Sequence, residues 1–299
     1  MNLGRYFTQK GIKLSGFYGK NINTTIEAAK ITKSKFYTNI QDIIKESDIL
    51  FITTPDDIIS IIDRELSKFD LTNKSVCHTS GSIKSNVLYN AKDSGALIYS
   101  IHPIFAFSNK NTNLKELENI YFSIESDVLK EQSSIENNTV INLIKSLGNK
   151  FFIRSKETSS IYHLANVFVS NLTLSLLDIG TSYLKKLGLT EDEALSAIRP
   201  LVEGNIESIF EKGFVNSLTG PVSRGDVTTI KNHLSVLEKE DKDIYNILSL
   251  NLLKFVAIRD NNTMNLQNTK DDILNIKDEN VINNSEKHLE IYKVLGGID

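Results

Sequence analysis

Three short polar segments follow apolar runs that are typical of β-strands, and their side chains could bind a ligand. They are Thr-Thr-Pro-Asp at 53–56, His-Thr-Ser-Gly-Ser at 78–82 and His-Pro at 102–103. In an open α/β sheet, ligands bind beyond the carboxyl ends of the strands. Hydroxyls, a glycine and a proline allow a phosphate, ribose or substrate to approach closely, and a histidine can donate a proton or orient a substrate. Taken alone, each segment is equally explained as a capped turn.

A second group of polar residues interrupts the apolar segment 156–187. At about 100° per residue, a helix places Ser159, His163, Asn166 and Ser170 within a stripe roughly 60° wide. A narrow polar stripe on an otherwise apolar helix needs hydrogen-bond partners. The stripe therefore predicts either a helix face that binds substrate or hydrogen bonding between packed helices.

Positioning these groups requires a particular order of elements. Up to residue 155, predicted strands at 12–18, 48–55, 75–80, 96–104, 119–125 and 150–154 alternate with predicted helices at 1–10, 23–30, 40–46, 56–68, 82–92 and 128–147. Asn23 or Thr24 is the expected N-cap of the second helix. This alternation predicts an α/β fold with a Rossmann-like, mostly parallel sheet.

Beyond residue 155 the sequence predicts helices only, at 156–187, 191–212, 222–237 and 241–259. A polar, Asn- and Asp-rich segment follows at 261–284, and then one short helix at 286–295. We therefore expect a Rossmann-like domain at 1–155, a helical domain at 156–260 and a polar tail at 261–299.

Two further segments contain candidate ligand-binding residues. In dinucleotide-binding folds, an acid after the second strand favours NAD, but residues 18–21 contain no acid and include Lys20. Lys20 therefore favours the 2′-phosphate of NADP, with an ordinary surface lysine as the alternative. In segment 218–226, Thr219 and Arg224 could contact a substrate, or Arg224 could pair with Asp226 at a helix N-terminus. The five dispersed histidines give no metal-site spacing.

Composition excludes several classes of protein. The 299 residues suffice for two domains, and 40% hydrophobic with 24% charged residues is typical of a soluble protein. A net charge of -3 gives no electrostatic reason to expect nucleic acid or an anionic membrane as partner. No secretory signal is evident, and no stretch approaches about 20 apolar residues. The single cysteine, Cys77, is expected to be buried in a cytoplasmic protein.

Taken in order, these segments resemble a family of bacterial Rossmann-like proteins of unknown function. The family is related to pyrroline-5-carboxylate reductase, ketopantoate reductase and the β-hydroxyacid dehydrogenases. The resemblance covers residues 3–253, and the matching segments are 3–6, 51–57, 78–81, 100–103, 162–166, 170–171, 200–204 and 218–226. It implies an NADP-binding domain followed by a helical domain of the 6-phosphogluconate-dehydrogenase C-terminal type, which forms a homodimer.

The resemblance also implies which residues act. Hydride would pass from NAD(P)H to a small carbonyl or imine metabolite in the cleft between the domains. Asn166 would match an asparagine of the β-hydroxyacid dehydrogenases, and His163 or His102 would replace the lysine that the stripe lacks. The expected cofactor contacts are Lys20, Thr53, Thr54, Pro55, Ser80 and Gly81. The expected substrate contacts are Ser170, Asn171, Thr219 and Arg224.

The start of the sequence departs from this family. Its members begin with a strand and a Gly-x-Gly-x-x-Gly turn that binds the pyrophosphate, whereas this sequence begins inside the next helix. We therefore expect NADP binding to be weak or lost, with a misplaced start codon or a real truncation as explanations. The absent strand would be central, leaving a hydrophobic slot. A non-catalytic nucleotide-binding, metabolite-binding or dimerisation protein with a degenerate cofactor site is the alternative function.

Overall fold

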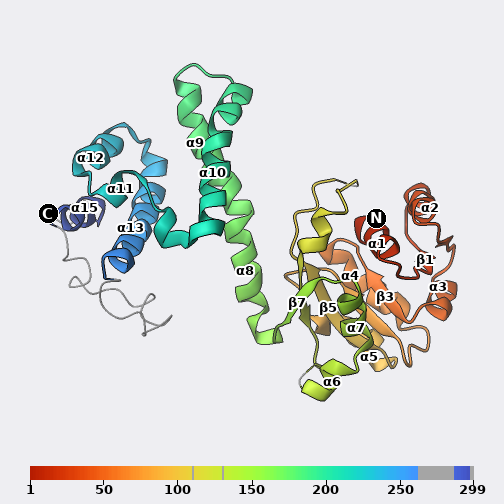
Figure 1. Ribbon diagram of the computed structural model, residues 1–299. Helices are drawn as coiled ribbons and strands as arrows, with labels where there is room; N and C mark the ends of the chain where they lie inside the picture. Colours follow the sequence, from red (N-terminus) through yellow and green to blue (C-terminus); the bar gives the residue numbers. More distant parts are fainter. Residues whose placement is uncertain (110, 130, 262–285, 297–299) are drawn as a thin grey trace. The chain divides into compact units, whose positions relative to one another are not determined.

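The structure is a computed structural model that describes residues 1–109, 111–129, 131–261 and 286–296. The chain divides into two compact units, Met1–Leu174 and Ser175–Asp299 (Figure 1). Most of the predicted polar tail, residues 262–285, lies outside the described residues. The last strand ends at Ile153, whereas the two compact units divide between Leu174 and Ser175, so the domain boundary expected near Ser155 stays a prediction.

A five-stranded sheet lies at the centre of the first unit, in the order β3-β4-β5-β6-β7. The first three strands are parallel, β6 is antiparallel to β5, and β7 is parallel to β6. Strands β1 and β2 form a separate parallel pair. The sheet is therefore mostly parallel, as predicted. The strands are β1 Gly16–Phe17, β2 Lys35–Phe36, β3 Ile49–Ile52, β4 Ser75–His78, β5 Leu97–Pro103, β6 Tyr121–Glu125 and β7 Lys150–Ile153.

Two hydrophobic clusters pack against the five-stranded sheet. Along β4, Val76 belongs to one cluster and its neighbour Cys77 to the other; along β5, Ile98 and Tyr99 divide in the same way. Successive residues of a strand point to opposite faces, so the sheet is covered on both sides. Helix α4, Asp56–Leu66, contributes to one cluster and helix α7, Thr139–Ser146, to the other. Cys77 is fully buried, as predicted.

The helices of the first unit follow the predicted order, with local differences. They are α1 Asn2–Gln9, α2 Ile22–Ile31, α3 Ile40–Glu46, α4 Asp56–Leu66, α5 Tyr89–Asp93, α6 Gln132–Glu136, α7 Thr139–Ser146 and α8 Ser159–Val169. Short 3₁₀ helices cover Ser85–Leu88, Glu116–Asn119 and Lys156–Thr158.

Several local predictions were wrong, for reasons of capping and length. Asn21, rather than Asn23 or Thr24, caps α2, because its side chain accepts a hydrogen bond from the Thr24 amide. The helix predicted at 128–147 is two helices, because Asn138 caps α7 through the amides of residues 140 and 141. The strand predicted at 12–18 has only two residues, and β2 was not predicted. By contrast, the helix predicted at 56–68 begins at Asp56 as expected, with Pro55 as its N-cap.

The remaining helices are α9 Asn171–Lys186, α10 Glu191–Ser217, α11 Gly220–Arg224, α12 Val227–Val236, α13 Lys239–Asn261 and α15 Glu286–Gly296. The single helix predicted at 156–187 breaks at Ser170, whose φ is -117° and ψ is -81°. The helix predicted at 222–237 is interrupted by Gly225, a left-handed residue with φ of 67°. Helices α11, α12, α13 and α15 enclose a core that includes Val222, Ile230 and Leu253.

The segment Lys156–Lys186 requires one correction. By length and composition alone it is apolar enough to cross a membrane, and almost none of its most apolar window is buried. The expectation that no stretch approaches such a length is therefore wrong. Hydropathy averaged over a window outweighs the few small polar residues, such as Ser170 and Thr173, that interrupt the apolar run. The same exposure is found on helices that a second protein chain covers.

Candidate active site

The carboxyl ends of β3 and β4 are joined through Asp56. The hydroxyls of Ser80 and Ser82 both donate to Asp56 Oδ2, at 2.9 and 2.7 Å. Asp56 lies in the first turn of α4, where the helix dipole favours a carboxylate. Two of the three predicted polar segments therefore meet at one edge of the sheet, as parallel strands require. Beside them, the Thr54 hydroxyl is buried without a hydrogen-bond partner among the described residues.

His78 holds the turn after β4 from inside. Its ring is fully buried, its Nε2 lies 3.2 Å from the Lys84 carbonyl oxygen, and its Nδ1 accepts a 3.3 Å hydrogen bond from the Ser80 amide. This pattern puts the proton on Nε2, which donates to the carbonyl. Burial lowers the pKa of His78 to about 4. His78 is therefore a neutral structural residue at neutral pH.

The third predicted segment joins the site through His102. Its Nδ1 lies 2.5 Å from the hydroxyl oxygen of Tyr162, a residue of α8. A Cβ on Gly81 would lie 3.0 Å from three atoms of the His102 ring. A glycine at 81 therefore lets the histidine ring lie against the end of β4. Burial, reinforced by the Arg154 charge, lowers the pKa of His102 to about 4.

Arg154 is a buried cation that follows β7 and binds hydroxyl groups only. Its Nε donates to Ser123 Oγ at 2.9 Å and its Nη2 to Ser100 Oγ at 3.0 Å, while Nη1 donates to Ser159 Oγ. Its Cζ lies 4.9 Å from the centroid of the Tyr162 ring. Among the residues that the structure describes, no carboxylate forms an ion pair with it. Arg154 thus places an unpaired positive charge beside the His102–Tyr162 pair.

The polar stripe on α8 finds most of its partners within the protein. Ser159 binds Arg154, Asn166 Nδ2 donates to the Tyr162 carbonyl at 2.8 Å, and the Ser170 hydroxyl donates to the Asn166 carbonyl at 2.6 Å. Ser170 also donates to Asn171 Oδ1 at 3.0 Å. The His163 side chain is exposed. The stripe therefore does not depend on a neighbouring helix for its hydrogen bonds.

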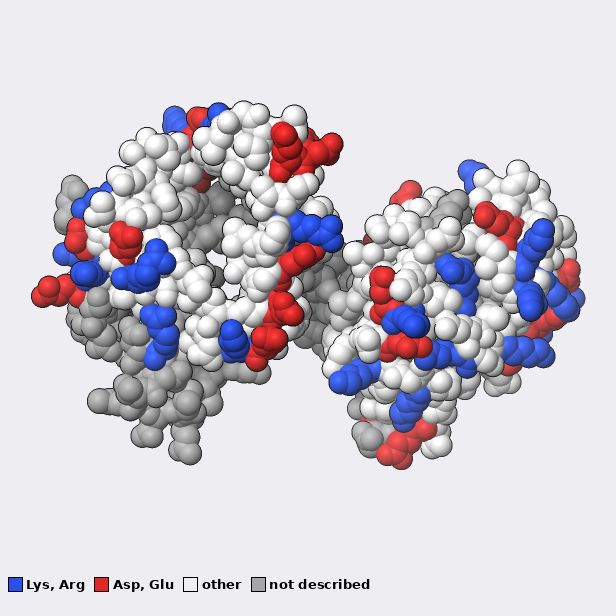
Figure 2. Space-filling view, turned by 45° about the horizontal axis from the view of Figure 1, so that its top comes forward, with Lys and Arg blue, Asp and Glu red and all other residues white. Residues whose placement is uncertain are grey.

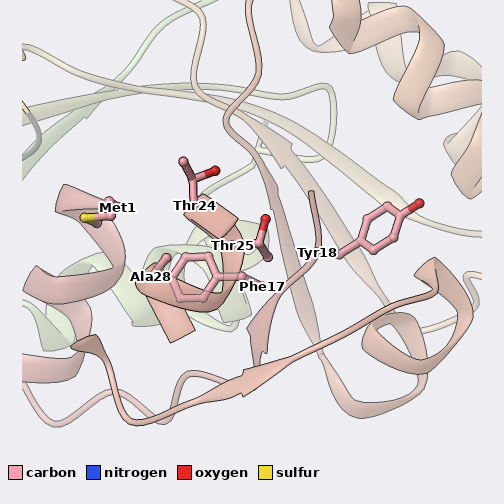
Figure 3. Close-up of a pocket in the computed structure, with 6 residues that line it drawn as sticks. All are labelled: Met1, Phe17, Tyr18, Thr24, Thr25 and Ala28. Carbon is pink, nitrogen blue, oxygen red and sulfur yellow. The ribbon is translucent and has the colours of Figure 1, made fainter. Parts of the chain in front are cut away.

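A pocket lies where the sequence predicted the adenosine end of a dinucleotide. Its volume is about 290 Å³, and it is lined from the start of α1, the end of β1 and helix α2 (Figure 3) by Met1, Phe17, Tyr18, Thr24, Thr25 and Ala28. Lys20 is exposed two residues beyond Tyr18 and does not line the pocket. The size lies at the lower end for a small-molecule site.

The predicted substrate residues of the second unit occupy ordinary helix ends. Thr219 is the exposed N-cap residue of α11, and Arg224 is exposed in the last turn of the same helix. Asp226 accepts hydrogen bonds from the Thr229 amide and hydroxyl at 3.0 and 2.8 Å, and thereby caps α12. Contact of Thr219 and Arg224 with a substrate stays a prediction.

Arg154, Tyr162, Ser100 and Ser123 were not predicted as site residues. One signal was available, since Tyr162 precedes Asn166 by one helical turn and must share its face. The other signal was Arg154 itself, a lone arginine at the end of an apolar strand. Among the described residues no cluster of three His, Cys, Asp or Glu side chains could hold a metal ion.

Comparisons with known proteins show which family and which solved structures this chain is similar to. Residues 120–252, less than half of the chain, match the family described as "Domain of unknown function (DUF2520)". No curated protein sequence matches the chain. The crystal structure of protein TM1727 from Thermotoga maritima is 25% identical, with a TM-score of 0.65 over 87% of this chain and 97% of that one.

Two further solved structures are more distant. BF3122 from Bacteroides fragilis, described as an inferred NADP oxidoreductase, is 21% identical with a TM-score of 0.60, covering 83% of this chain and 91% of that one. A pyrroline-5-carboxylate reductase from Coxiella burnetii is 12% identical with a TM-score of 0.52, covering 90% and 94%. At these identities the likeness shows the fold. The resemblance found in the sequence is therefore confirmed: residues 120–252 carry the DUF2520 domain, in a Rossmann-like chain related in fold to pyrroline-5-carboxylate reductase.

Proposed function

We propose that the protein is an oxidoreductase that uses NAD(P)H, with NADPH preferred, to reduce a small carbonyl or imine metabolite. The observation that carries this proposal is the His102–Tyr162 hydrogen bond beside the carboxyl ends of β3, β4 and β5. Ligands of open α/β sheets bind at this edge. The similarity to BF3122, described as an inferred NADP oxidoreductase, and to a pyrroline-5-carboxylate reductase supports the same class of reaction.

The residues that would hold the cofactor lie at the same edge. The nicotinamide half would bind beside Thr53, Thr54, Pro55, Ser80 and Gly81, where the buried Thr54 hydroxyl has a free hydrogen-bonding capacity. The adenosine half would occupy the pocket next to Tyr18, with Lys20 attracting a 2′-phosphate. When bound, the dihydronicotinamide supplies the hydride.

The chain's own side chains would orient the substrate. His102 is neutral at neutral pH and suits a hydrogen-bonding role, and His163 and Asn166 lie on the same helix as Tyr162. Ser170 and Asn171, at the break between α8 and α9, are proposed to contact the substrate. Positioning and polarisation by such groups account for much of the rate in hydride-transfer enzymes.

Cofactor affinity is expected to be low for this sequence. It contains no Gly-x-Gly-x-x-Gly turn, which usually holds the pyrophosphate on backbone amides. Strands β1 and β2 are hydrogen-bonded to each other and not to the five-stranded sheet among the described residues. We therefore propose that this sequence binds NADPH weakly, and a micromolar dissociation constant would contradict this proposal.

The proposal is tested by titrating NADPH fluorescence and then screening carbonyl and imine compounds for NADPH oxidation. We expect oxidation with at least one compound class, and loss of oxidation in His102→Ala with the NADPH dissociation constant unchanged. Glu203→Ala is the matched control, because Glu203 is exposed and pairs only with Arg199, at 2.7 Å. NADPH binding without oxidation of any compound would favour the non-catalytic binding protein instead.

We also propose that the chain forms a homodimer in the cytoplasm. Helices α8, α9 and α10 expose large apolar side chains, and Figure 2 shows broad areas without charged side chains between scattered charged ones. Among the exposed residues are Val169 at 77%, Leu174 at 67%, Leu201 at 67% and Phe210 at 86%. Apolar surface of this extent is typical of an interface. Phe210→Ser should shift the molar mass in light scattering toward the monomer, whereas Ile22→Ser on α2 should not.

A further inference from the structure

We propose that Tyr162 is the proton donor of this site and that Arg154 is the positioning residue that stabilises the phenolate left after proton transfer. The inference rests on the proposed reductase function and deepens it, because neither residue was a candidate from the sequence. Three structural elements meet at Tyr162: the end of β5 through His102, the end of β7 through Arg154, and helix α8, to which Tyr162 itself belongs.

The tyrosine ring is held on several sides. The His102 ring packs edge-on at 5.7 Å between centroids, and the Phe152 ring does so at 5.9 Å. The Arg154 guanidinium carbon lies 4.9 Å from the ring centroid. The hydroxyl is fixed at 2.5 Å from His102 Nδ1, while the side chain as a whole is only half-buried. Tyr162 is therefore oriented and yet accessible to a small molecule.

The other candidate donors fit the role less well. Burial and the Arg154 charge keep His102 neutral, with a pKa of about 4, so its imidazolium is scarce at neutral pH. The charged and titratable groups that act on His102 are Arg154 and His163, which disfavour its charged form, and Asp56, which favours it. His163 is exposed to solvent, and no hydrogen bond holds its side chain among the described residues. A neutral His102 with its ring proton on Nδ1 can instead donate a hydrogen bond to the Tyr162 oxygen, which leaves the phenol proton free for the substrate.

Arg154 has the electrostatic position that phenolate stabilisation needs. Burial raises the pKa of Tyr162, while hydrogen bonding with Ser123 and then the positive charge of Arg154 oppose that rise. Glu125, whose charge acts on Arg154 through space, accepts hydrogen bonds from the Ser85 amide at 2.6 Å and the Ser85 hydroxyl at 2.8 Å. The field of Arg154 is thus directed at Tyr162 without an intervening ion pair.

In the proposed step, a hydride with its electron pair would pass from the bound dihydronicotinamide, which is oxidised, to the carbon of the C=O or C=N group, which is reduced. The electron pair of that double bond moves to the substrate oxygen or nitrogen. The O–H bond of Tyr162 breaks, and the proton forms a new bond to the substrate oxygen or nitrogen. Tyr162 becomes a phenolate facing Arg154 and His102, and a proton from water restores the phenol. Removal of a positioned general acid typically lowers a rate 10²–10⁴-fold.

The test compares Tyr162→Phe with Tyr121→Phe, in the holoprotein with NADPH present. Tyr121 also lies under a cation, with Lys150 Nζ at 5.7 Å, but it is exposed and distant in the chain from α8. We expect kcat to fall about 100-fold or more in Tyr162→Phe, with the NADPH dissociation constant and melting temperature unchanged, and no effect in Tyr121→Phe. Retention of more than about a tenth of kcat by Tyr162→Phe would overturn the proposal.

A second measurement decides the case in which Tyr162→Phe does not fold. That measurement is the pH dependence of kcat in the wild type and in Arg154→Met. If Tyr162 is the acid, kcat falls as pH rises through the pKa of Tyr162, and Arg154→Met moves that fall to higher pH. A fall in kcat near the pKa of a histidine, unaffected by Arg154→Met, overturns the proposal and leaves the reductase function standing. Absence of NADPH oxidation in the wild type rejects both.

Discussion

Replacing Gly81 by alanine would place a methyl group against the ring of His102. The added Cβ lies 3.0 Å from the ring atoms Cδ2, Cε1 and Nε2. Ordinary carbon contacts lie at about 3.5–4.0 Å, so the ring has to move by roughly 0.5 Å. Gly81 is not among the glycines with a left-handed φ, so this substitution tests the close approach alone.

The displacement acts on the hydrogen bond between His102 and Tyr162. His102 Nδ1 lies 2.5 Å from the Tyr162 hydroxyl, and a shift of the ring by half an ångström lengthens or bends that hydrogen bond. Overpacking typically costs about 1–3 kcal/mol, and a weakened hydrogen bond adds about 1 kcal/mol. We therefore expect Gly81→Ala to lower the free energy of unfolding of the first unit by about 2–4 kcal/mol.

Urea unfolding followed by circular dichroism measures this change, and NMR of the histidine ring protons reports the His102 environment. Only five histidines contribute signals, which makes the assignment practical. Gly204→Ala is the control, since no atom lies within 4 Å of the added Cβ and the helix should gain about 1 kcal/mol. An unfolding free energy within about 0.5 kcal/mol of the wild type, with unchanged His102 signals, would refute the close-contact reasoning.

Three further perturbations test the fold around the site. Asp63 is fully buried and accepts hydrogen bonds from the Asn90 amide, the Asn90 side chain and the Ala91 amide, at 3.2, 2.6 and 2.9 Å. Asp63→Ala should therefore lower the free energy of unfolding in urea by about 3 kcal/mol. Asp57→Ala, at an exposed position, should change it by almost nothing. Between pH 6.5 and 4, His78 binds a proton in the unfolded chain but not in the folded protein, where its pKa is about 4. Stability is therefore lost as pH falls through this window, by up to about 3 kcal/mol. His78→Gln should flatten that dependence, and an unchanged slope would contradict the burial argument. Burial raises the pKa of the Cys77 thiol, and we expect a disulfide reagent to label it only when urea unfolds the first unit; rapid labelling of the native protein would show that the β4 core is open.

Much of the sheet could be predicted from the sequence because its signals are local. The runs that became β3, β4 and β5 are apolar, end in polar segments and alternate with amphipathic helices, so their type and order follow from short windows. The carboxyl ends of parallel strands share one edge, which is why residues 53–56, 78–82 and 102–103 were expected to lie together. The burial of Cys77 follows from the same pattern.

Some local features were predicted wrongly because competing signals lie within a few residues. Asn138 caps a new helix inside a segment whose apolar period continues through it, and Ser170 ends α8 although apolar residues follow on both sides. A helix break depends on a few backbone torsion angles, which the average hydropathy of a window does not record.

The central group of the site was decided only by the tertiary structure. His102 and Tyr162 are 60 residues apart, and Arg154 and Ser100 are 54 apart. Their meeting depends on the antiparallel register of β6, which places Ser123 opposite His102, and on α8 following β7. The sequence by itself determined the type and order of the elements, because burial periodicity is a property of neighbouring residues. Which side chains meet depends on strand order, strand direction and helix packing, which are set by contacts between distant parts of the chain.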